Sequence, residues 1–414
     1  MPSASSPATC RRRSSAMETS RGSFVDRQAM SYATVTDEEE TLDAQRDLAV
    51  FNTPADLGGG LTVRNRFALA PMTRLKSVSG VPTEVDVDYY RRRAAADVGL
   101  ILTEGVHVRD PAAGFSPRVP HMYGDDAAAG WRRIVDAVHA EGTAIMPQLW
   151  HAGAVRGTEY ERGPETETVS PSGLDLAGAP VGRSLTVADI EGAIENFVES
   201  ALVAKDAGFD GIELHGAHGY LFDQFLWPRT NRRTDRYGLA DDYGTRFSVE
   251  TITAIRAAVG SDFPIVFRFS QWKSDHYDAQ IAGTSLELER ILTPLADAGV
   301  SIFHPSTRRH WSPAFPAEGE LSLAGWTRKI TGRPVIAVGS VGVGALMGSD
   351  NTAVRETVEQ RIAFLRRQFE RGEFDVVAIG RALLADSEWV RKVLAGRLDE
   401  VRPYSRPPQG ERLY

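Results

Sequence analysis

Eight short apolar runs, each followed by a stretch with helical spacing, account for most of the chain. The runs are rich in Val, Ile, Leu and Phe and are bounded by turn-forming residues, which is typical of buried strands. Several of the amphipathic stretches between them close on a glycine that suits a helix C-cap: Gly142, Gly208, Gly299 and Gly332. The pattern predicts helices within 186–207, 243–259 and 285–298, and strands at 67–72, 99–106, 143–149, 209–214, 264–269, 300–304, 334–338 and 374–379.

Eight strand–helix units in one chain predict the α/β class and a single (β/α)8 TIM barrel. A doubly wound sheet is the alternative, but no G-x-G-x-x-G motif follows the first strand. Residues 48–66 hold two short apolar runs around a Gly triplet and predict a hairpin before the barrel. The segment 343–373 is longer than the other connections and contains a charged helix at 356–371. We expect no second domain there, and therefore one barrel domain over 45–414.

The first 44 residues are polar, rich in Ser, Thr and Arg, and lack an apolar period. This composition predicts a disordered head. The basic run at 11–13 resembles a transit peptide, whereas an over-extended gene start, with Met17 or Met30 as the true first residue, is the alternative. Because no apolar signal-peptide core is present, we expect a cytoplasmic protein.

Charge and cysteine content narrow the class of protein. The formal net charge of −8 argues against a nucleic-acid or anionic-membrane surface. No apolar run approaches the roughly 20 residues that a membrane span needs. Cys10 is the single cysteine, so one chain can form no disulfide, all-cysteine zinc site or cysteine-ligated iron–sulfur cluster.

Chemistry-bearing side chains gather at the predicted strand ends, where the functional groups of a barrel collect. The fourth run leads directly into His215, His218 and Tyr220. Taken alone, this group suits a hydrogen-bonded histidine pair in a core about as well as a catalytic site, and a metal site is a third reading.

Two further groups of strand ends indicate a ligand. Gln148 and Arg268, after the third and fifth runs, suit a planar ring with amide and carbonyl edges, because arginine binds such an edge bidentately. The alternative for Arg268 is an ion pair with a carboxylate inside the barrel. The ends of the seventh and eighth runs suit a phosphate held by backbone N–H groups; their residues are Gly339, Ser340, Gly380 and Arg381.

With these residues in place, the chain resembles the Old Yellow Enzyme family of FMN ene-reductases over residues 48–395. The long ordered block HGAHGYLFDQFLWPRTNRRTDRYG (215–238) carries the resemblance most specifically. Shorter motifs support it by their positions: RFALAPMTR (66–74), LTEGV (102–106), PQLWHAG (147–153), FRFS (267–270), AVGS (337–340) and AIGRALLADSEW (378–389).

The resemblance implies an FMN site. Pro71, Met72 and Thr73 would run beside the isoalloxazine, with Thr73 near its O4, and Gly105 would leave room for the ring. Gln148 would bind the pyrimidine edge and Arg268 its N1 and O2 atoms. The phosphate would be held by Gly339, Ser340, Gly380 and Arg381.

The resemblance also implies a substrate site and a reaction. His215 and His218 would bind the carbonyl oxygen of the substrate, Trp150 would line its pocket, and Tyr220 would donate a proton. The expected activity is ping-pong reduction of the C=C bond of enones, with nitroalkenes as further acceptors, by NADH or NADPH. No metal is expected, and a homodimer is compatible with the family.

Three departures from the family pattern matter. Many members have Asn where this chain has His218, which leaves the role intact and alters carbonyl affinity. Thr73 stands where one branch has a redox-sensitive cysteine. The cysteines of iron–sulfur relatives are missing, so we expect neither a cluster nor an added dinucleotide domain. His310 and Trp311 line the substrate pocket in one reading and belong to a surface loop in the other.

Two rival functions remain open at this point. One is a metal-dependent or Schiff-base barrel lyase or hydrolase, with the two histidines as ligands or with Lys76 or Lys273 as the amine. The other is a non-catalytic flavin-binding protein, against which the intact tyrosine and histidine pair argue. The colour and turnover of the purified protein would separate them.

Overall fold

The structure, a computed structural model, describes residues 48, 50–114, 116–157, 167–342 and 358–404. The predictions for the head at 1–44 and for the first part of the segment 343–373 lie outside these ranges. No helix in the described part of the chain is long and apolar enough to cross a membrane.

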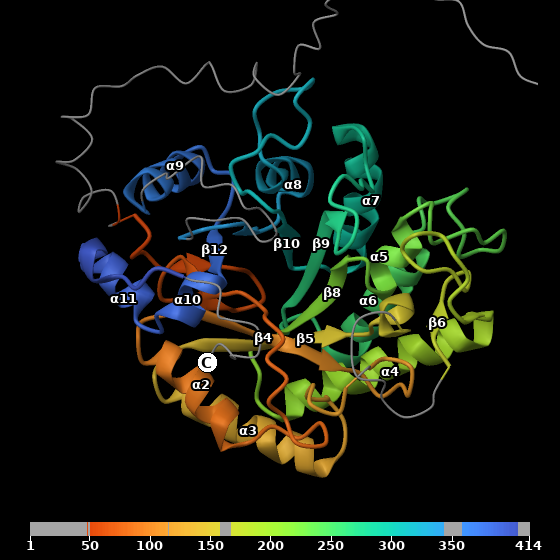
Figure 1. Cartoon of the computed structure of the whole chain (residues 1–414), viewed down its shortest axis with the longest axis horizontal. Helices are drawn as coiled ribbons and strands as arrows, with labels where there is room; N and C mark the ends of the chain where they lie inside the picture. The colour runs from red at the N-terminus through yellow and green to blue at the C-terminus, as the bar shows by residue number, and fades with distance from the viewer. Residues whose placement is uncertain (1–47, 49, 115, 158–166, 343–357, 405–414) are drawn as a thin grey trace, which may run out of the picture. The chain divides into compact units, whose positions relative to one another are not determined.

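Eight parallel strands form a closed barrel, as predicted, and helices surround it (Figure 1). The strand order around the barrel is β10-β11-β12-β3-β4-β5-β8-β9. In chain order the barrel strands are β3 (Phe67–Leu69), β4 (Leu100–His107), β5 (Ala144–Trp150), β8 (Ile212–His218), β9 (Ile265–Lys273), β10 (Ile302–Ser306), β11 (Ile336–Val338) and β12 (Val376–Ile379).

The helices fall where the amphipathic spacing predicts them. The charged helix predicted at 356–371 is described as Val358–Glu370. The α-helices are α2 (Glu84–Ala94), α3 (Asp125–His139), α4 (Val187–Asp206), α5 (Leu221–Leu226), α6 (Arg246–Val259), α7 (Ser285–Ala298), α8 (Leu323–Thr331), α9 (Val358–Glu370), α10 (Arg381–Ala385) and α11 (Trp389–Leu394), with short 3-10 turns at Gly153–Gly157 and Leu398–Glu400.

Helix α7 illustrates how sequence sets these boundaries. The Thr284 hydroxyl accepts the Glu287 N–H at the helix start, and Gly299 ends the helix in the left-handed conformation at φ 118°. A threonine N-cap satisfies a backbone donor, and glycine adopts this φ without steric cost. The buried face of the helix consists of Leu288, Ile291, Leu292, Leu295 and Ala296.

The predicted hairpin is the antiparallel pair β1 (Ala55–Asp56) and β2 (Thr62–Val63). Its apolar side chains join the cluster inside the barrel, near the N-terminal ends of the strands, so the hairpin closes that end. A second short pair, β6 (Val169–Ser170) with β7 (Arg183–Ser184), is parallel.

The barrel interior changes from apolar to polar along the strands. Side chains two positions apart on a strand point to the same face, so alternate residues face inward. The inward residues near the strand starts form a lower interior cluster: Ala68, Leu100, Leu102, Met146, Val266, Ile302, Ile336 and Val376. On β5, β9 and β10, the inward residue two positions farther along is polar: Gln148, Arg268 and His304. We call the buried set Gln148, Glu213, Arg268 and His304 the polar layer.

Two strand boundaries differ from the prediction for identifiable reasons. β8 begins at Ile212 rather than at residue 209, because Phe209 still donates its N–H to Ala204 as the end of α4 unwinds. β8 also continues through His218, so both histidines belong to the strand. β3 ends at Leu69 rather than at residue 72, since Pro71 has no N–H to continue the ladder.

Candidate active site

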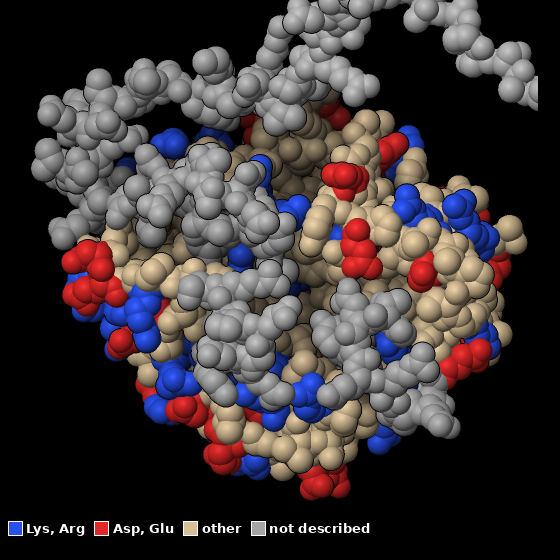
Figure 2. Space-filling view, in the orientation of Figure 1, with Lys and Arg blue, Asp and Glu red and all other residues tan. Residues whose placement is uncertain are grey.

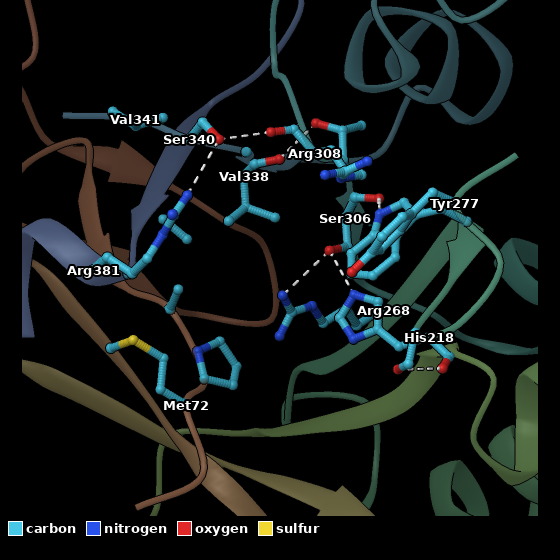
Figure 3. Close-up of a pocket in the computed structure, with 18 of the residues that line it drawn as sticks. Met72, His218, Arg268, Tyr277, Ser306, Arg308, Val338, Ser340, Val341 and Arg381 are labelled. Carbon is cyan, nitrogen blue, oxygen red and sulfur yellow. Dashed lines mark hydrogen bonds between the residues drawn. The ribbon is translucent and has the colours of Figure 1, made fainter. Parts of the chain in front are cut away.

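A cavity of about 520 Å³ opens where the barrel strands end. Figure 3 shows Met72 and Arg381 on one side of it and His218 and Tyr277 on the other. The face seen in Figure 2 is hollowed near its centre, and basic residues lie at the edge of the hollow. The lining residues are Ala70, Pro71, Met72, His218, Tyr220, Arg268, Trp272, Ser274, Tyr277, Ser306, Thr307, Arg308, Val338, Gly339, Ser340, Val341, Ala378, Gly380 and Arg381.

Most of the predicted site residues line this cavity. They are Pro71, Met72, His218, Tyr220, Arg268, Gly339, Ser340, Gly380 and Arg381. Five predicted residues do not line it: Thr73 is exposed, and Gly105, Gln148, Trp150 and His215 are buried.

The predicted His–His–Tyr group forms one aromatic cluster. The ring centroids of His215 and His218 are 5.2 Å apart and nearly perpendicular, and those of His215 and Tyr220 are 4.8 Å apart. Trp150 packs edge-on against Tyr220 at 4.8 Å. The structure therefore brings the predicted catalytic residues together: His218 and Tyr220 line the cavity, and the buried His215 and Trp150 pack against them.

A strained turn presents His218 to the cavity. His218 has φ 65° and Gly219 has φ 86°, both left-handed, which is uncommon for a residue with a side chain. Ser270 accepts the His218 N–H at 2.9 Å, and the Ser274 hydroxyl donates to the His218 carbonyl at 3.0 Å. A Cβ on Gly219 would lie 2.6 Å from Leu176, so this position requires glycine.

A buried ion pair anchors the same turn. Asp223 accepts the Gly219 N–H at 2.6 Å, and its other oxygen lies 2.9 Å from the Lys273 ammonium. Both side chains are fully buried. Because the Lys273 ammonium is buried and paired with Asp223, it stabilises the turn and is not available to form a Schiff base with a substrate.

Both histidines are neutral at ordinary pH. Burial lowers the pKa of His215 and of His218 well below the usual value, and the nearby Arg268 guanidinium lowers each further. His218 Nε2 lies 2.8 Å from the Ser306 hydroxyl, which also accepts from Arg268 at 3.3 Å. The buried His215 Nδ1 has no hydrogen-bond partner among the described residues.

The opposite side of the cavity suits an anion. Ser340 has φ 56°, and its hydroxyl accepts from Arg381 at 3.3 Å while donating to the Arg308 carbonyl at 2.7 Å. Gly380 precedes α10, whose first residue is Arg381. A Cβ on Gly339 would lie 2.5 Å from the Thr307 hydroxyl, so the close approach of β11 to the end of β10 requires glycine.

The loop after β3 is tied to β4 through a buried carboxylate. Glu104 accepts the Arg74 N–H at 2.9 Å and lies 3.4 Å from the Arg74 side chain. Burial raises the pKa of Glu104 to about 7, while the Arg74 charge opposes the rise. Arg74 also stacks over Tyr89 at 3.8 Å. These contacts set the course of the loop that carries Met72 into the cavity.

The close packing of Trp150 explains why residue 105 is a glycine, a contact that the sequence did not indicate. A Cβ at this position would lie 2.5 Å from Trp150 Cε3. The register of β4 against β5 shifts between Leu102 and Gly105, which opposes Gly105 to Gln148. A bulge of this kind redirects side chains next to a functional site.

Several cavity residues were missed by the sequence reasoning. Trp272 packs 4.4 Å from His218 and donates to the Ser306 carbonyl, and Arg308 stacks over Tyr277 at 3.9 Å. The signal for Ser306 was its position two residues after His304 on the same strand. No signal marked Trp272, which lies near the end of β9, or Tyr277, which follows that strand.

His310 and Trp311 are not among the residues that line the cavity. His310 is buried, and its Nδ1 lies 2.5 Å from Gln368 of α9. Trp311 packs edge-on against His310. Of the two readings given for these residues, the structure favours a position away from the cavity, because the chain after β10 turns His310 toward α9.

The donor set fits a planar, partly anionic ligand with a phosphate. Three guanidinium groups and no carboxylate lie among the described lining residues. Arg268 is buried, its Nε has no partner among the described residues, and burial lowers its pKa while the Glu213 carboxylate opposes that shift. In the described ranges, no group of three His, Cys, Asp or Glu side chains could hold a metal ion.

Comparison with known proteins agrees with the geometry. The model of the NADH:flavin oxidoreductase / NADH oxidase family matches residues 50–400. The NADH oxidase of Thermoanaerobacter brockii is 37% identical over 352 residues, which cover 83% of this chain and 50% of that protein. The 12-oxophytodienoate reductase 7 of Oryza sativa subsp. japonica is 37% identical over 229 residues, covering 52% of this chain and 57% of that protein. The chain thus matches only about half the length of these curated relatives.

Among solved structures, morphinone reductase in complex with tetrahydroNAD has the same fold. It aligns with a TM-score of 0.70 at 26% identity, and the alignment covers 87% of this chain and 94% of that one.

Proposed function

The chain belongs to the NADH:flavin oxidoreductase / NADH oxidase family, the Old Yellow Enzyme family that its motifs resemble, and we propose that it is an ene-reductase. Its acceptors are enones and nitroalkenes. Bound FMN, the cofactor of this family, supplies the redox chemistry of a ping-pong cycle in which hydride passes from NAD(P)H to the acceptor. The observation that carries the proposal is the aromatic cluster of His215, His218 and Tyr220 beside a cationic cavity.

The chain's own residues would hold the cofactor in two places. Backbone groups at Gly339, Ser340 and Gly380, with the Arg381 guanidinium, would bind the phosphate, and the left-handed φ of Ser340 supports this role. Gln148 and Arg268 would bind the pyrimidine edge, a role supported by the partnerless Nε of Arg268. The segment Pro71, Met72 and Thr73 would border the ring, with Gly105 behind it.

The two histidines would bind and polarise the acceptor. A neutral imidazole can donate one N–H to a carbonyl oxygen, which makes the β-carbon more electrophilic. The lowered pKa values of His215 and His218 support neutral donors at ordinary pH. His218 Nε2 is hydrogen-bonded to the Ser306 hydroxyl. To bind a substrate carbonyl, His218 would either exchange this hydrogen bond for one to the substrate or donate from its other ring nitrogen.

Tyr220 would protonate the α-carbon. A tyrosine hydroxyl carries a proton that it can transfer as a general acid. Its packing against His215 and Trp150 fixes the ring while its side chain faces the cavity. The Schiff-base rival loses support because Lys273 is sealed in its ion pair and Lys76 does not line the cavity.

The test begins with the purified protein. We expect a yellow protein that releases FMN on heating, is reduced by NADH or NADPH, and is reoxidised by cyclohexenone. Arg381→Ala should weaken FMN retention, whereas Arg309→Ala, at the exposed position beside Arg308, should not. Release of FAD, or a colourless folded protein, would contradict the cofactor assignment. FMN binding without enone turnover would instead favour the non-catalytic flavin-binding protein.

A further inference from the structure

A buried glutamate inside the barrel contacts Gln148, one of the two residues assigned to the pyrimidine edge. Glu213 is fully buried on β8, two residues before His215, so both side chains face inward. The sequence reasoning passed over it because the run 209–214 reads as an apolar strand. A buried carboxylate without hydrogen-bond partners strongly destabilises the folded state, so the partners of Glu213 indicate its role.

Both oxygens of Glu213 accept hydrogen bonds from other strands. Gln148 Nε2 on β5 donates to one oxygen at 2.7 Å, and His304 Nδ1 on β10 lies 2.5 Å from the other. Both partners are also buried. The carboxylate fixes the orientation of the Gln148 amide, because only its NH₂ group can face an acceptor. The Gln148 carbonyl oxygen is therefore left to accept from a ligand N–H.

The charge of Glu213 acts on Arg268. The two residues lie on neighbouring strands, since Glu213 of β8 is opposite Val266 of β9, two residues before Arg268. Burial lowers the pKa of Arg268, and the carboxylate raises it against this larger effect. Burial outweighs the carboxylate at His304 and lowers its pKa, so His304 stays neutral. The polar layer thus holds one carboxylate on the strand next to one guanidinium, and the carboxylate partly offsets the positive charge that Arg268 brings to the cavity.

We propose that Glu213 is a positioning residue that orients Gln148 and sets the reduction potential of the bound FMN. This inference rests on the proposed function. Reduction places negative charge at the pyrimidine edge of a flavin, which a cation stabilises. By offsetting the charge of Arg268, Glu213 lowers the potential and keeps the reduced cofactor a strong hydride donor.

The test measures the potential of FMN-loaded protein by equilibration with a redox dye. Glu213→Gln keeps the shape and an acceptor for Gln148 but removes the charge. We expect the ratio of reduced to oxidised FMN at a fixed potential to rise at least tenfold, which is about 30 mV for two electrons. Glu213→Asp, which keeps the charge, should stay close to the parent value.

Two further variants sharpen the test. Glu373→Gln is the matched control, because Glu373 is equally buried but is bound by Ser322 and Arg371 and does not line the cavity. It should leave the potential unchanged. His304→Leu removes one of the two donors that stabilise the negative charge of Glu213, so the potential should rise, by less than in Glu213→Gln. This variant carries the test if Glu213→Gln does not fold.

An unchanged potential in both Glu213→Gln and His304→Leu, or an equal shift in Glu373→Gln, would overturn the inference. With intact enone reduction in the parent protein, that result would leave the proposed function standing. A shifted potential in a protein that reduces no enone would do the reverse: the inference would hold for the cofactor, and the proposed reaction would fail.

Discussion

The two ends of the barrel interior are built from opposite chemistry, although the same strands run through both. At one end, Met146, Val266 and Ile302 pack in the lower interior cluster, which the hairpin closes. Two residues farther along each strand stand members of the polar layer: Gln148, Arg268 and His304. A distance of two residues along a strand therefore separates an apolar core residue from a buried polar residue of the polar layer.

The largest expected effect breaks the apolar end. Leu102→Ala removes a fully buried side chain from the lower interior cluster and should reduce the free energy of unfolding by about 2–5 kcal/mol. FMN content and enone turnover per folded molecule should stay within about twofold, because Leu102 does not line the cavity. Leu286→Ala, at an exposed position on α7, is the control and should cost under about 0.5 kcal/mol. Unchanged unfolding in Leu102→Ala would mean that the apolar end is loosely packed.

The next effect breaks the polar end and leaves stability alone. Tyr220→Phe keeps the ring that packs on His215 and Trp150 but removes the proposed acid. Stopped-flow reoxidation by cyclohexenone should slow by about 10²-fold or more, whereas reduction by the nicotinamide should change only a few-fold. Nitroalkenes should be less affected, since the nitronate is stable enough to wait for a solvent proton. Tyr123→Phe, at a position that does not line the cavity, should reoxidise at the parent rate. Equal slowing of both half-reactions would show that Tyr220 only shapes the pocket.

A smaller effect tests the histidine pair as donors. Phenols should bind the oxidised protein as phenolates and give a long-wavelength charge-transfer band, because two N–H donors stabilise the anion. His215→Ala and His218→Ala should each weaken phenol binding by about 1–3 kcal/mol and raise the KM for enones. His139→Ala, on the outer surface of α3, should bind phenol normally. Unaltered titrations in both site variants would assign the pair a structural role.

The smallest effect is the acid sensitivity of the polar end. Burial lowers the pKa of His107, beside Trp150, to about 3. Below pH 6.5 the unfolded chain protonates this residue and the folded chain does not. Stability is therefore full above pH 6.5 and falls on acidification toward pH 3, by at most about 1.4 kcal/mol per pH unit from His107. Thermal melts of the parent and of His107→Gln between pH 6.5 and 5 should show the shallower slope in the variant. Parallel slopes would indicate that folded His107 takes up the proton.

The fold could be predicted from the sequence because the relevant signals are local. Strand runs, helical spacing and glycine caps such as Gly299 and Gly332 depend on near neighbours, and they gave the eight units and the hairpin. The positions at strand ends then followed from barrel geometry, which is why Arg268, His218 and Arg381 reach one cavity.

The rest depended on contacts between distant segments. His304 meets Glu213 across 91 positions of sequence, and no periodicity reports such a pair. The bulge in β4 reverses which residues face Trp150, so the reason for Gly105 became visible only in three dimensions. The two readings of His310 could not be separated, because the turn after β10 carries it toward α9 and residue spacing does not encode the direction of a turn.

The buried pair of Asp223 and Lys273 has a consequence for how this site can evolve. Replacing either residue alone would leave an uncompensated charge in the interior and cost about 3–5 kcal/mol, a large part of the stability of an ordinary domain. Descendants can therefore alter the turn that carries His218 only by changing both positions together, or through a neutral intermediate at one of them. Mutation can reach the outer rim, at Tyr277 and Arg308, in single steps. The outer rim of the cavity should thus change among descendants far faster than the turn that carries His218.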